Sequence, residues 1–306
     1  MRLKVRSWLL LLVVAAVVAA SIAGGLWYQS RSLTPVALMK RLPTGDALVL
    51  FADFGALRSS GVLELLQGSK AGEDPEYQSF ARRIGLDYAR DLDTVLAAFA
   101  PTGKYFLVKG RFDWKSLDGY VQSQGGRCEG SLCRMTGSAP ERRISFFPLR
   151  RNLMALAVSQ DDSAALRLNT SISEPESETP DAPVWLSIPT SALKARESLP
   201  EGTLMFASNV ARAESLTLGF VRDGNRYAIR INVRCRNEQD ATQVAADLTG
   251  TTDRLRKMIE RENQKPNPAD LSGVLVAGVF RAEGRRVLGS WPIERVLLQT
   301  VLGGGR

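Results

Sequence analysis

Residues 214–236, ESLTLGFVRDGNRYAIRINVRCR, give the clearest fold signal in this chain. Two apolar-rich runs, Glu214–Arg222 and Arg226–Arg236, flank Asp223-Gly224-Asn225, which is a strong turn signal. The second run alternates between apolar and polar residues, as a strand with one buried face does. The stretch therefore predicts an antiparallel hairpin with one face in a core and the other toward solvent.

The polar face of the second strand is rich in arginine. It carries Arg226, Arg230, Arg234 and Arg236. Two residues four positions apart on one strand face lie about 13 Å apart along the strand. Such a row could contact phosphate or carboxylate groups of an anionic envelope lipid or of a protein partner. The alternative is a solvated outer face that keeps the sheet soluble. Cys235 ends the opposite, apolar row, which predicts a buried and inert thiol.

The sequence from residue 46 onward predicts further strands, and helices between them. Strands are expected at residues 47–54, 93–99, 104–112, 143–148, 153–158, 184–188, 203–209, 214–222, 226–236, 274–280 and 286–291. Helices are expected at residues 56–67, 75–84, 113–124, 190–197, 238–262 and 293–302, with Asp113 as an N-cap. The fold class is therefore α+β.

A polar, acidic segment divides this material into two halves. Residues 169–183, NTSISEPESETPDAP, cannot bury a core and are interpreted as a linker. The first α+β half is residues 46–168, and the second is residues 184–302. We expect each half to be an antiparallel sheet covered by helices on one face. Residues 303–306 form a glycine-rich tail.

The two halves resemble each other, which indicates an internal duplication. Leu42-Pro43-Thr44-Gly45 precedes a run ending in Phe51-Ala52, and Leu199-Pro200-Glu201-Gly202 precedes one ending in Phe206-Ala207. The hairpins match as well: Phe99, Gly103 and Tyr105 correspond to Phe220, Gly224 and Tyr227.

With this repeated Leu-Pro-x-Gly motif behind an apolar N-terminal run, the chain resembles exported bacterial α+β proteins that carry a single membrane anchor. The resemblance covers most of residues 40–302 and rests on short motifs. It implies an architecture, and it implies no activity and no site residues.

The N-terminal run predicts a membrane segment. Arg2, Lys4 and Arg6 form a short basic tip, residues 1–6, and residues 7–30 read SWLLLLVVAAVVAASIAGGLWYQS without a charge. Such a run is long enough to span roughly 30 Å of hydrocarbon as a helix. The positive-inside rule places the tip in the cytoplasm of a bacterium and the remainder in the periplasm. Residues 31–45 then form a juxtamembrane linker.

The same run also fits a cleaved secretory signal. Ser21-Ile22-Ala23 offers small residues to a peptidase before Gly24. We favour a retained anchor, because the apolar run continues past that point to Trp27 and Tyr28, which suit the outer interface.

Composition excludes several function classes. The 306 residues include no histidine, which removes Ser-His-Asp and Cys-His catalysis and histidine metal ligation. Three cysteines without a Cys-x-x-Cys pair argue against a zinc site, and no phosphate-binding Walker motif occurs. The net charge of +8 is spread thinly, unlike that of a nucleic-acid-binding protein. We therefore expect no metal, no cofactor and no nucleic-acid partner.

One catalytic pattern remains as an alternative. Ser191 and Lys194 form a Ser-x-x-Lys pair at an expected helix start, which is how penicillin-binding enzymes place nucleophile and base. The partner motifs of those enzymes, Lys-Thr-Gly and Ser-Asp-Asn, are missing. The alternative function is an exported hydrolase that uses this pair or carboxylates. The other interpretation is a solvent-facing helix turn.

Cys128 and Cys133 flank a predicted two-residue turn at Gly130-Ser131. In that hairpin the two cysteines face each other across a non-hydrogen-bonded pair, within reach of a disulfide. An oxidising compartment favours the bond. Two reduced cysteines in a strand pair are the alternative.

The sequence thus predicts a membrane-anchored envelope protein whose ectodomain binds or scaffolds a partner without catalysis. It predicts neither the identity of that partner nor an oligomeric state.

Overall fold

The computed structural model describes residues 34–66, 75–137, 139, 141–170, 179–189, 191–192, 206, 208–210, 212–224 and 226–302. The basic tip and expected anchor, Lys194, the second Leu-Pro-x-Gly motif and the tail lie outside these residues. No helix in the described part of the chain combines the length and the apolar composition needed to cross a bilayer.

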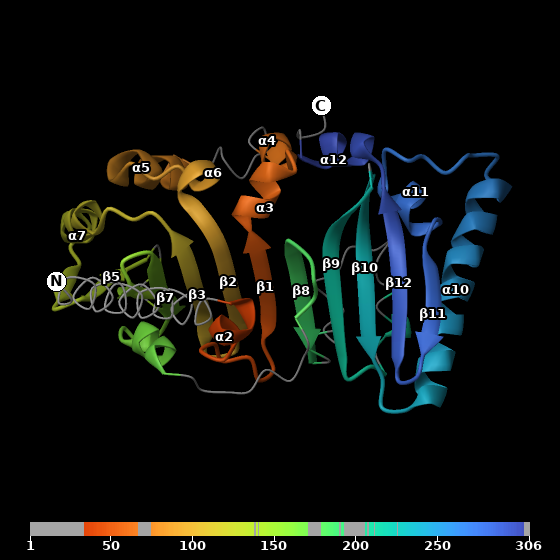
Figure 1. The fold of residues 1–306 in the computed structure, drawn as a ribbon, viewed down its shortest axis with the longest axis horizontal. Coiled ribbons are helices and arrows are strands. Elements are labelled where there is room, and N and C mark those ends of the chain that lie inside the picture. The colour runs from red at the N-terminus through yellow and green to blue at the C-terminus, as the bar shows by residue number, and fades with distance from the viewer. Residues whose placement is uncertain are drawn as a thin grey trace, which may run out of the picture.

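One large antiparallel sheet organises the molecule, and helices lie along its faces and one end (Figure 1). Its 12 strands have the order β11-β12-β10-β9-β8-β1-β2-β3-β7-β6-β5-β4, and every neighbouring pair is antiparallel. The strands of the first half are β1 (Leu48–Asp53), β2 (Leu92–Ala100), β3 (Gly103–Gly110), β4 (Arg127–Glu129), β5 (Leu132–Thr136), β6 (Arg143–Arg150) and β7 (Leu153–Ser159). Those of the second half are β8 (Val184–Pro189), β9 (Ser215–Asp223), β10 (Arg226–Arg234), β11 (Val279–Glu283) and β12 (Arg286–Ile293).

Short helices dominate, with one long exception, α10. The helices are α2 (Pro35–Met39), α3 (Phe54–Ser59), α4 (Val62–Leu66), α5 (Pro75–Ile84), α6 (Tyr88–Asp91), α7 (Trp114–Ser123), the 3₁₀ helix η2 (Ala164–Asn169), α10 (Glu238–Arg261), α11 (Leu271–Leu275) and α12 (Arg295–Leu302). The mixed content and the large antiparallel sheet confirm the α+β class at that level.

The strand order is the same on both sides of the central β1–β8 pair. Outward from this pair run β1-β2-β3-β7-β6 on one side and β8-β9-β10-β12-β11 on the other. Each side consists of a first strand, a hairpin, and a later hairpin whose second strand lies inward. Strands β5 and β4 extend only the first half.

The two faces of the sheet are covered differently. We call the side that carries α2 and η2 the α2 face, and the opposite side, which carries α7 and α10, the α10 face. On the α2 face, Leu38 of α2, Leu42 just after it and Leu168 of η2 pack with strand residues such as Leu107 and Trp185.

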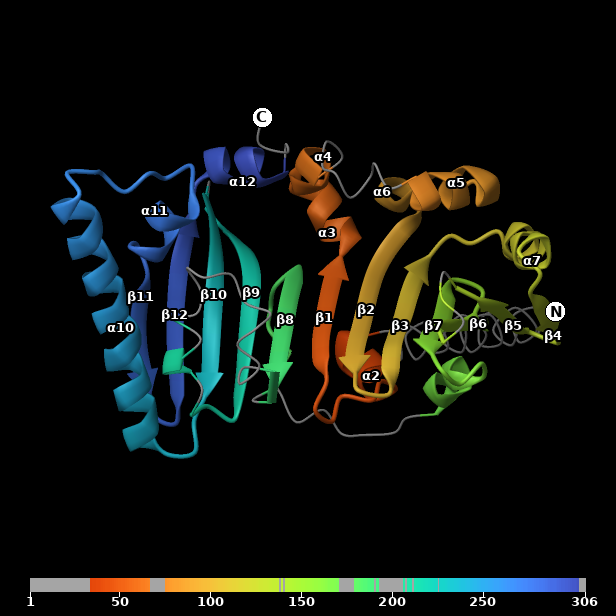
Figure 2. The same cartoon turned by 180° about the vertical axis from the view of Figure 1, so that it is seen from behind.

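On the α10 face, α10 packs over the second half and α7 over the outer strands of the first. The buried side of α10 contributes Val244 and Leu248, which pack with Val233 and Val287 of the sheet. Figure 2 shows this face from the front. The first half is thus covered on both faces, whereas the expectation was one face for each half.

Two expected strands are wrong. Phe206, Ser208 and Asn209 are helical, because this segment packs against α10 rather than pairing with the sheet. The Asn209 amide donates to the Asp247 carbonyl at 3.2 Å and to Thr251 Oγ1 at 2.7 Å, and the ring of Phe206 meets Trp291 edge-on at 5.9 Å.

The second error is the strand expected at residues 274–280, because its first two residues are the end of α11 (Leu271–Leu275) and a turn follows them. The Asp270 carboxylate caps this helix by accepting the backbone N–H groups of Ser272 at 2.9 Å and Gly273 at 3.2 Å. This cap starts a helix in an apolar run whose composition alone favours a strand. Strand β11 begins only at Val279.

Candidate binding groove on the open half of the sheet

One structural difference between the halves lies on the α2 face. Over the first half this face is covered by α2 and η2, whereas no described helix covers it over the second half (Figure 1). There the cover is the extended segment 179–182, the end of the expected linker, which lies over Gly219 of β9. The β-carbon of Ala182 comes to 3.2 Å from the position that a β-carbon at residue 219 would occupy, so glycine permits this close approach.

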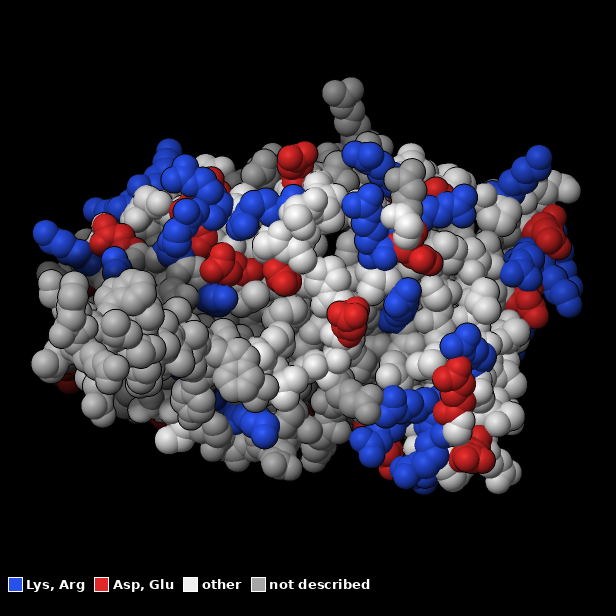
Figure 3. Space-filling view, in the orientation of Figure 1, with Lys and Arg blue, Asp and Glu red and all other residues white. Residues whose placement is uncertain are grey.

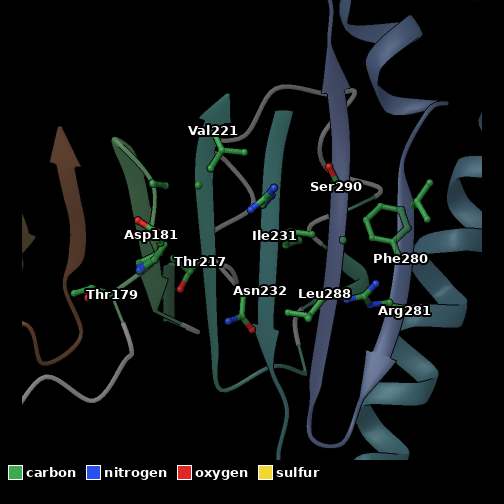
Figure 4. A pocket seen from close by; sticks show the side chains of 16 residues that line it. Thr179, Asp181, Thr217, Val221, Ile231, Asn232, Phe280, Arg281, Leu288 and Ser290 are labelled. Carbon is green, nitrogen blue, oxygen red and sulfur yellow. The ribbon is translucent and has the colours of Figure 1, made fainter. Parts of the chain in front are cut away.

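A groove of about 620 Å³ remains between segment 179–182 and strands β9, β10, β12 and β11. Strand register explains its floor, since pairing places residues of the same face in rows across the sheet. One row is Gly219, Arg230, Ser290 and Val279. The next row is Thr217, Asn232, Leu288 and Arg281, whose side chains are shown in Figure 4.

The floor mixes hydrogen-bonding and apolar groups. Thr217, Asn232 and Ser290 supply hydroxyl and amide groups, while Val221 and Leu288 supply apolar contact area. Asp181 lies on the covering segment. The surrounding surface carries scattered charges of both signs (Figure 3).

The four arginines of the expected row have different environments. Three have acidic partners: Arg226 Nε lies 3.9 Å from Glu294 Oε1, Arg234 Nε lies 3.6 Å from Glu214 Oε2, and Arg236 Nε lies 3.2 Å from Asp240 Oδ2. Arg236 also lies beyond the end of β10, in the turn before α10, so it does not continue the row.

Arg230 differs from the other three. It is exposed, it lines the groove, and it has no acidic partner among the residues that the structure describes. Arg281, the other guanidinium in the groove, pairs with Glu283 at 2.7 Å. Of the four arginines of the expected row, Arg230 is therefore the one whose guanidinium has no acidic partner among the described residues.

The expected Ser-Lys pair can be placed only in part. Ser191 is exposed, and its hydroxyl hydrogen-bonds to the Asp46 carboxylate; Lys194 lies outside the described residues. This hydroxyl thus contacts an acid in the turn before β1, at the lower end of the central strands.

Carboxyls with lowered pKa values are explained by local hydrogen bonds. The Ser116 hydroxyl and backbone lower the pKa of Asp113, the Ser163 hydroxyl and backbone lower that of Asp161, and the Ser272 hydroxyl contributes most at Asp270. Asp113 and Asp270 are helix N-caps, which hold the carboxylate form at the positive helix end. These shifts come from local hydrogen bonds and do not indicate acid–base catalysis.

The three cysteines have different environments. Cys128 and Cys133 face each other across β4 and β5 and are joined by a disulfide. Asp118 lies beside them, but the bonded sulfurs are not available as thiolate ligands for a metal. Cys235 is fully buried, and burial, followed by the nearby charges of Asp240 and Glu214, raises the pKa of its thiol.

Sequence reasoning missed the groove itself. The segment 179–182 looks like ordinary linker, and its packing on the sheet depends on the strand order. Gly219 was the one local signal, because glycine inside a strand often marks a close backbone approach.

Known proteins resemble this chain only in fold. No family model matches the sequence, and no curated protein matches it significantly. Among solved structures, crystal form III of TP0453 has a TM-score of 0.51 at 11% identity, covering 89% of this chain and 99% of that one. Crystal forms IV and I of TP0453 have TM-scores of 0.49 and 0.48, each at 13% identity and covering 90% and 89% of this chain and 98% of the other. The first similarity shows a shared overall fold and nothing about activity.

Proposed function

We propose that this chain is a membrane-anchored protein of the bacterial envelope whose periplasmic part is a non-catalytic binding module. Its binding site is the groove on the α2 face of the second half. The ligand is an acidic, extended segment of a partner protein. The observation that carries the proposal is Arg230, an exposed guanidinium in an open groove with no acidic partner among the described residues.

The chemistry of the floor favours a protein segment over a lipid. Thr217, Asn232 and Ser290 can exchange hydrogen bonds with peptide amides, and Val221 and Leu288 can contact an apolar side chain. Arg230 would pair with a carboxylate of the segment, where bidentate contact gives both affinity and orientation. A volume of about 620 Å³ is within the usual range for small-ligand sites, roughly 300–1,000 Å³, and fits a few residues.

A direct test uses a fluorescein-labelled peptide of alternating glutamate and valine and the full chain in amphipol. Fluorescence anisotropy should show saturable binding that Arg230→Glu weakens at least roughly tenfold, because attraction becomes repulsion at one contact. Arg226→Glu is the matched control: it makes the same charge change on the same strand, but Arg226 does not line the groove.

Equal losses in Arg230→Glu and Arg226→Glu would show that only net charge matters and would refute the groove. Binding of the peptide with lysine in place of glutamate would refute the acidic preference. Association of the chain with phosphatidylglycerol vesicles that Arg230→Glu abolishes, without any peptide binding, would assign the groove to lipid instead.

The retained anchor at residues 7–30 is part of the same proposal. Mass spectrometry of the mature protein should find an N-terminus at or next to Met1, and the protein should stay with membranes after alkaline extraction. A mature chain beginning at Gly24 or close to it would replace the anchor with a cleaved signal.

We also propose that the halves derive from a duplication. Support comes from the common strand order on either side of β1 and β8, with α7 and α10 in corresponding places after the β2–β3 and β9–β10 hairpins. In this alignment β8 corresponds to β1, so the hairpin match between Gly103 and Gly224 is retained. The Leu-Pro-x-Gly match is not, because it pairs β1 with the helical segment at 206–209.

A further inference from the structure

A second cavity, on the opposite side of the molecule from the groove, has a different character. It lies on the α10 face of the first half and measures about 800 Å³. Its walls are α5 and α7, and its floor is formed by β3, β7, β6 and β5.

Strand register makes the floor apolar. Lys104 pairs with Val158, Val158 with Ile144, and Ile144 with Met135, which places these four residues in one row across four strands. Phe106 adds an aromatic ring beside the row and meets Phe99 edge-on at 6.0 Å.

The helix wall is held in place from behind. Tyr120 of α7 lines the cavity and packs edge-on against Phe80 of α5, with ring centroids 5.0 Å apart. Phe80 and Ile84 of α5 belong to the apolar cluster under α7. This packing fixes the distance between the helices and the sheet, so the concavity is built into the fold.

The rim of this cavity is cationic. Arg83 of α5, Lys104 of β3 and Arg142, which precedes β6, are all exposed and line it. None of the three has an ion pair with an acidic residue in the described part of the chain, and no aspartate or glutamate lines the cavity. Three cations without acidic partners among the described residues, set around an apolar floor, are complementary to a ligand with an anionic group and an apolar part.

We infer that this cavity binds an anionic amphiphile, a molecule with a phosphate or carboxylate head and a hydrocarbon tail. The head lies at the rim among Arg83, Lys104 and Arg142, where guanidinium and ammonium groups donate to anionic oxygens. The tail lies along Phe106, Val158 and Ile144, where burial of apolar area drives binding. This inference concerns a different face and a different half from the groove, and it does not rest on the function proposed for the groove.

Photo-crosslinking to the full chain in its native membranes tests the site. The probe is dodecyl phosphate with a diazirine in the tail, and labelled peptides are identified by mass spectrometry. Labelling should concentrate on peptides containing Tyr120, Met135 and Ile144. Excess dodecyl phosphate should compete, whereas dodecyl maltoside and inorganic phosphate, which each lack half of the recognised chemistry, should compete poorly.

The variant Arg83→Gln/Lys104→Gln/Arg142→Gln should lower the labelling of these peptides at least roughly tenfold, since three exposed charge contacts of modest strength add up. The matched control, Arg82→Gln/Lys115→Gln/Arg127→Gln, removes the same charge from α5, α7 and β4 without touching the cavity and should label normally. A second variant, Gln124→Trp, places a bulky ring at the rim and should also reduce labelling while leaving the charges in place.

Equal labelling of the cation variant and wild type would overturn the inference, as would efficient competition by dodecyl maltoside, which would indicate a purely apolar site. Labelling spread evenly over the chain would show partition of the probe into the bilayer and would also overturn it. The two sites are distinguished by where the label lands, because probe bound in the groove would label peptides of β9, β10 and β12 rather than those containing Tyr120, Met135 and Ile144.

Discussion

At the scale of single residues, Trp185 joins the two halves of the molecule. Its ring stacks on that of Phe51 across the β1–β8 pair, with centroids 5.5 Å apart and planes 19° from parallel. The side chain is only 2% exposed and packs with the core under α2.

We predict that Trp185→Ala lowers the free energy of unfolding by about 3–5 kcal/mol, the range for emptying a buried aromatic site. Denaturant titration followed by circular dichroism measures the change. Val279→Ala, at a side chain that is 70% exposed, should change stability by no more than about 0.5 kcal/mol. A loss at Trp185 no larger than at Val279 would show that the junction is not a core contact.

Three carboxylates held by local hydrogen bonds, of which Asp113 and Asp270 are helix caps, predict how stability depends on pH. The pKa values of Asp113, Asp161 and Asp270 are lowered in the folded chain. Their contribution is therefore complete above the unfolded-state pKa of about 3.9 and is lost as the pH falls through the lower, folded-state values. The free energy of unfolding should therefore decline below about pH 4, as these carboxylates become protonated.

The triple variant Asp113→Asn/Asp161→Asn/Asp270→Asn should show a flatter acid limb in denaturant midpoints measured between pH 3 and pH 7. Asparagine retains capping at positions 113 and 270, so the main effect should be on the pH dependence rather than on stability at neutral pH. The control Asp223→Asn, in the β9–β10 turn, caps no helix and should keep the wild-type slope. An unchanged slope in the triple variant would mean that other groups dominate acid unfolding.

At the scale of elements, the β4–β5 hairpin depends on its disulfide. It lies at the edge of the sheet, β4 has only three residues, and the cysteines are five positions apart. In the chain-entropy account a loop this short contributes about 2 kcal/mol.

We predict that Cys128→Ser/Cys133→Ser destabilises the hairpin by about that amount, seen as faster amide hydrogen exchange in β4 and β5. Exchange in β9 and β10, which lie far from this edge, should not change. Chemical reduction of the wild type should reproduce the effect and should leave the double variant unchanged. Equal exchange before and after reduction would show that β-pairing alone holds the edge.

Elements with strong local signals could be predicted from the sequence. The hairpin at Asp223-Gly224-Asn225, helix α5 and the Cys128–Cys133 register all follow from turn chemistry, spacing and alternation, and the structure places them as expected. Their signals are local, so no knowledge of distant contacts was needed.

Elements decided by distant contacts could not be predicted. The segment containing Phe206, Ser208 and Asn209 is helical because it packs against α10, with contacts 38 and 42 residues away in the sequence. The error at α11 is of another kind, because the Asp270 cap is a local signal that the apolar composition of the run outweighed in the prediction. The groove depends on which hairpins become neighbours, and the pairing of β10 with β12, which joins two separate hairpins, was not readable from spacing. Arg226 and Arg234 have acidic partners, Glu294 and Glu214, that lie outside their own strand. The sequence alone therefore could not distinguish these two arginines from Arg230.

At the scale of the whole molecule, the two halves share one sheet. Val184 to Ser187 of β8 pair with β1 on one side and with β9 on the other, so the hydrogen-bonded ladder runs through the junction without a break. The halves also share apolar contacts there, since Val184, Phe220 and Tyr227 pack with Leu57 and Val62. A continuous sheet with shared cores should unfold as one unit.

Cooperative unfolding can be tested with Trp114 in the first half and Trp291 in the second. Two variants, each retaining one of these tryptophans and having phenylalanine at the other tryptophan positions, should give coincident denaturation midpoints by fluorescence. Leu186→Pro, which removes a ladder donor in the middle of β8, should split the transitions, because proline is not accommodated inside a central strand. The exposed control Val279→Ala should leave them coincident. Midpoints that already differ without the proline would mean that β8 connects two independently stable halves, and the groove could then be studied in the second half alone.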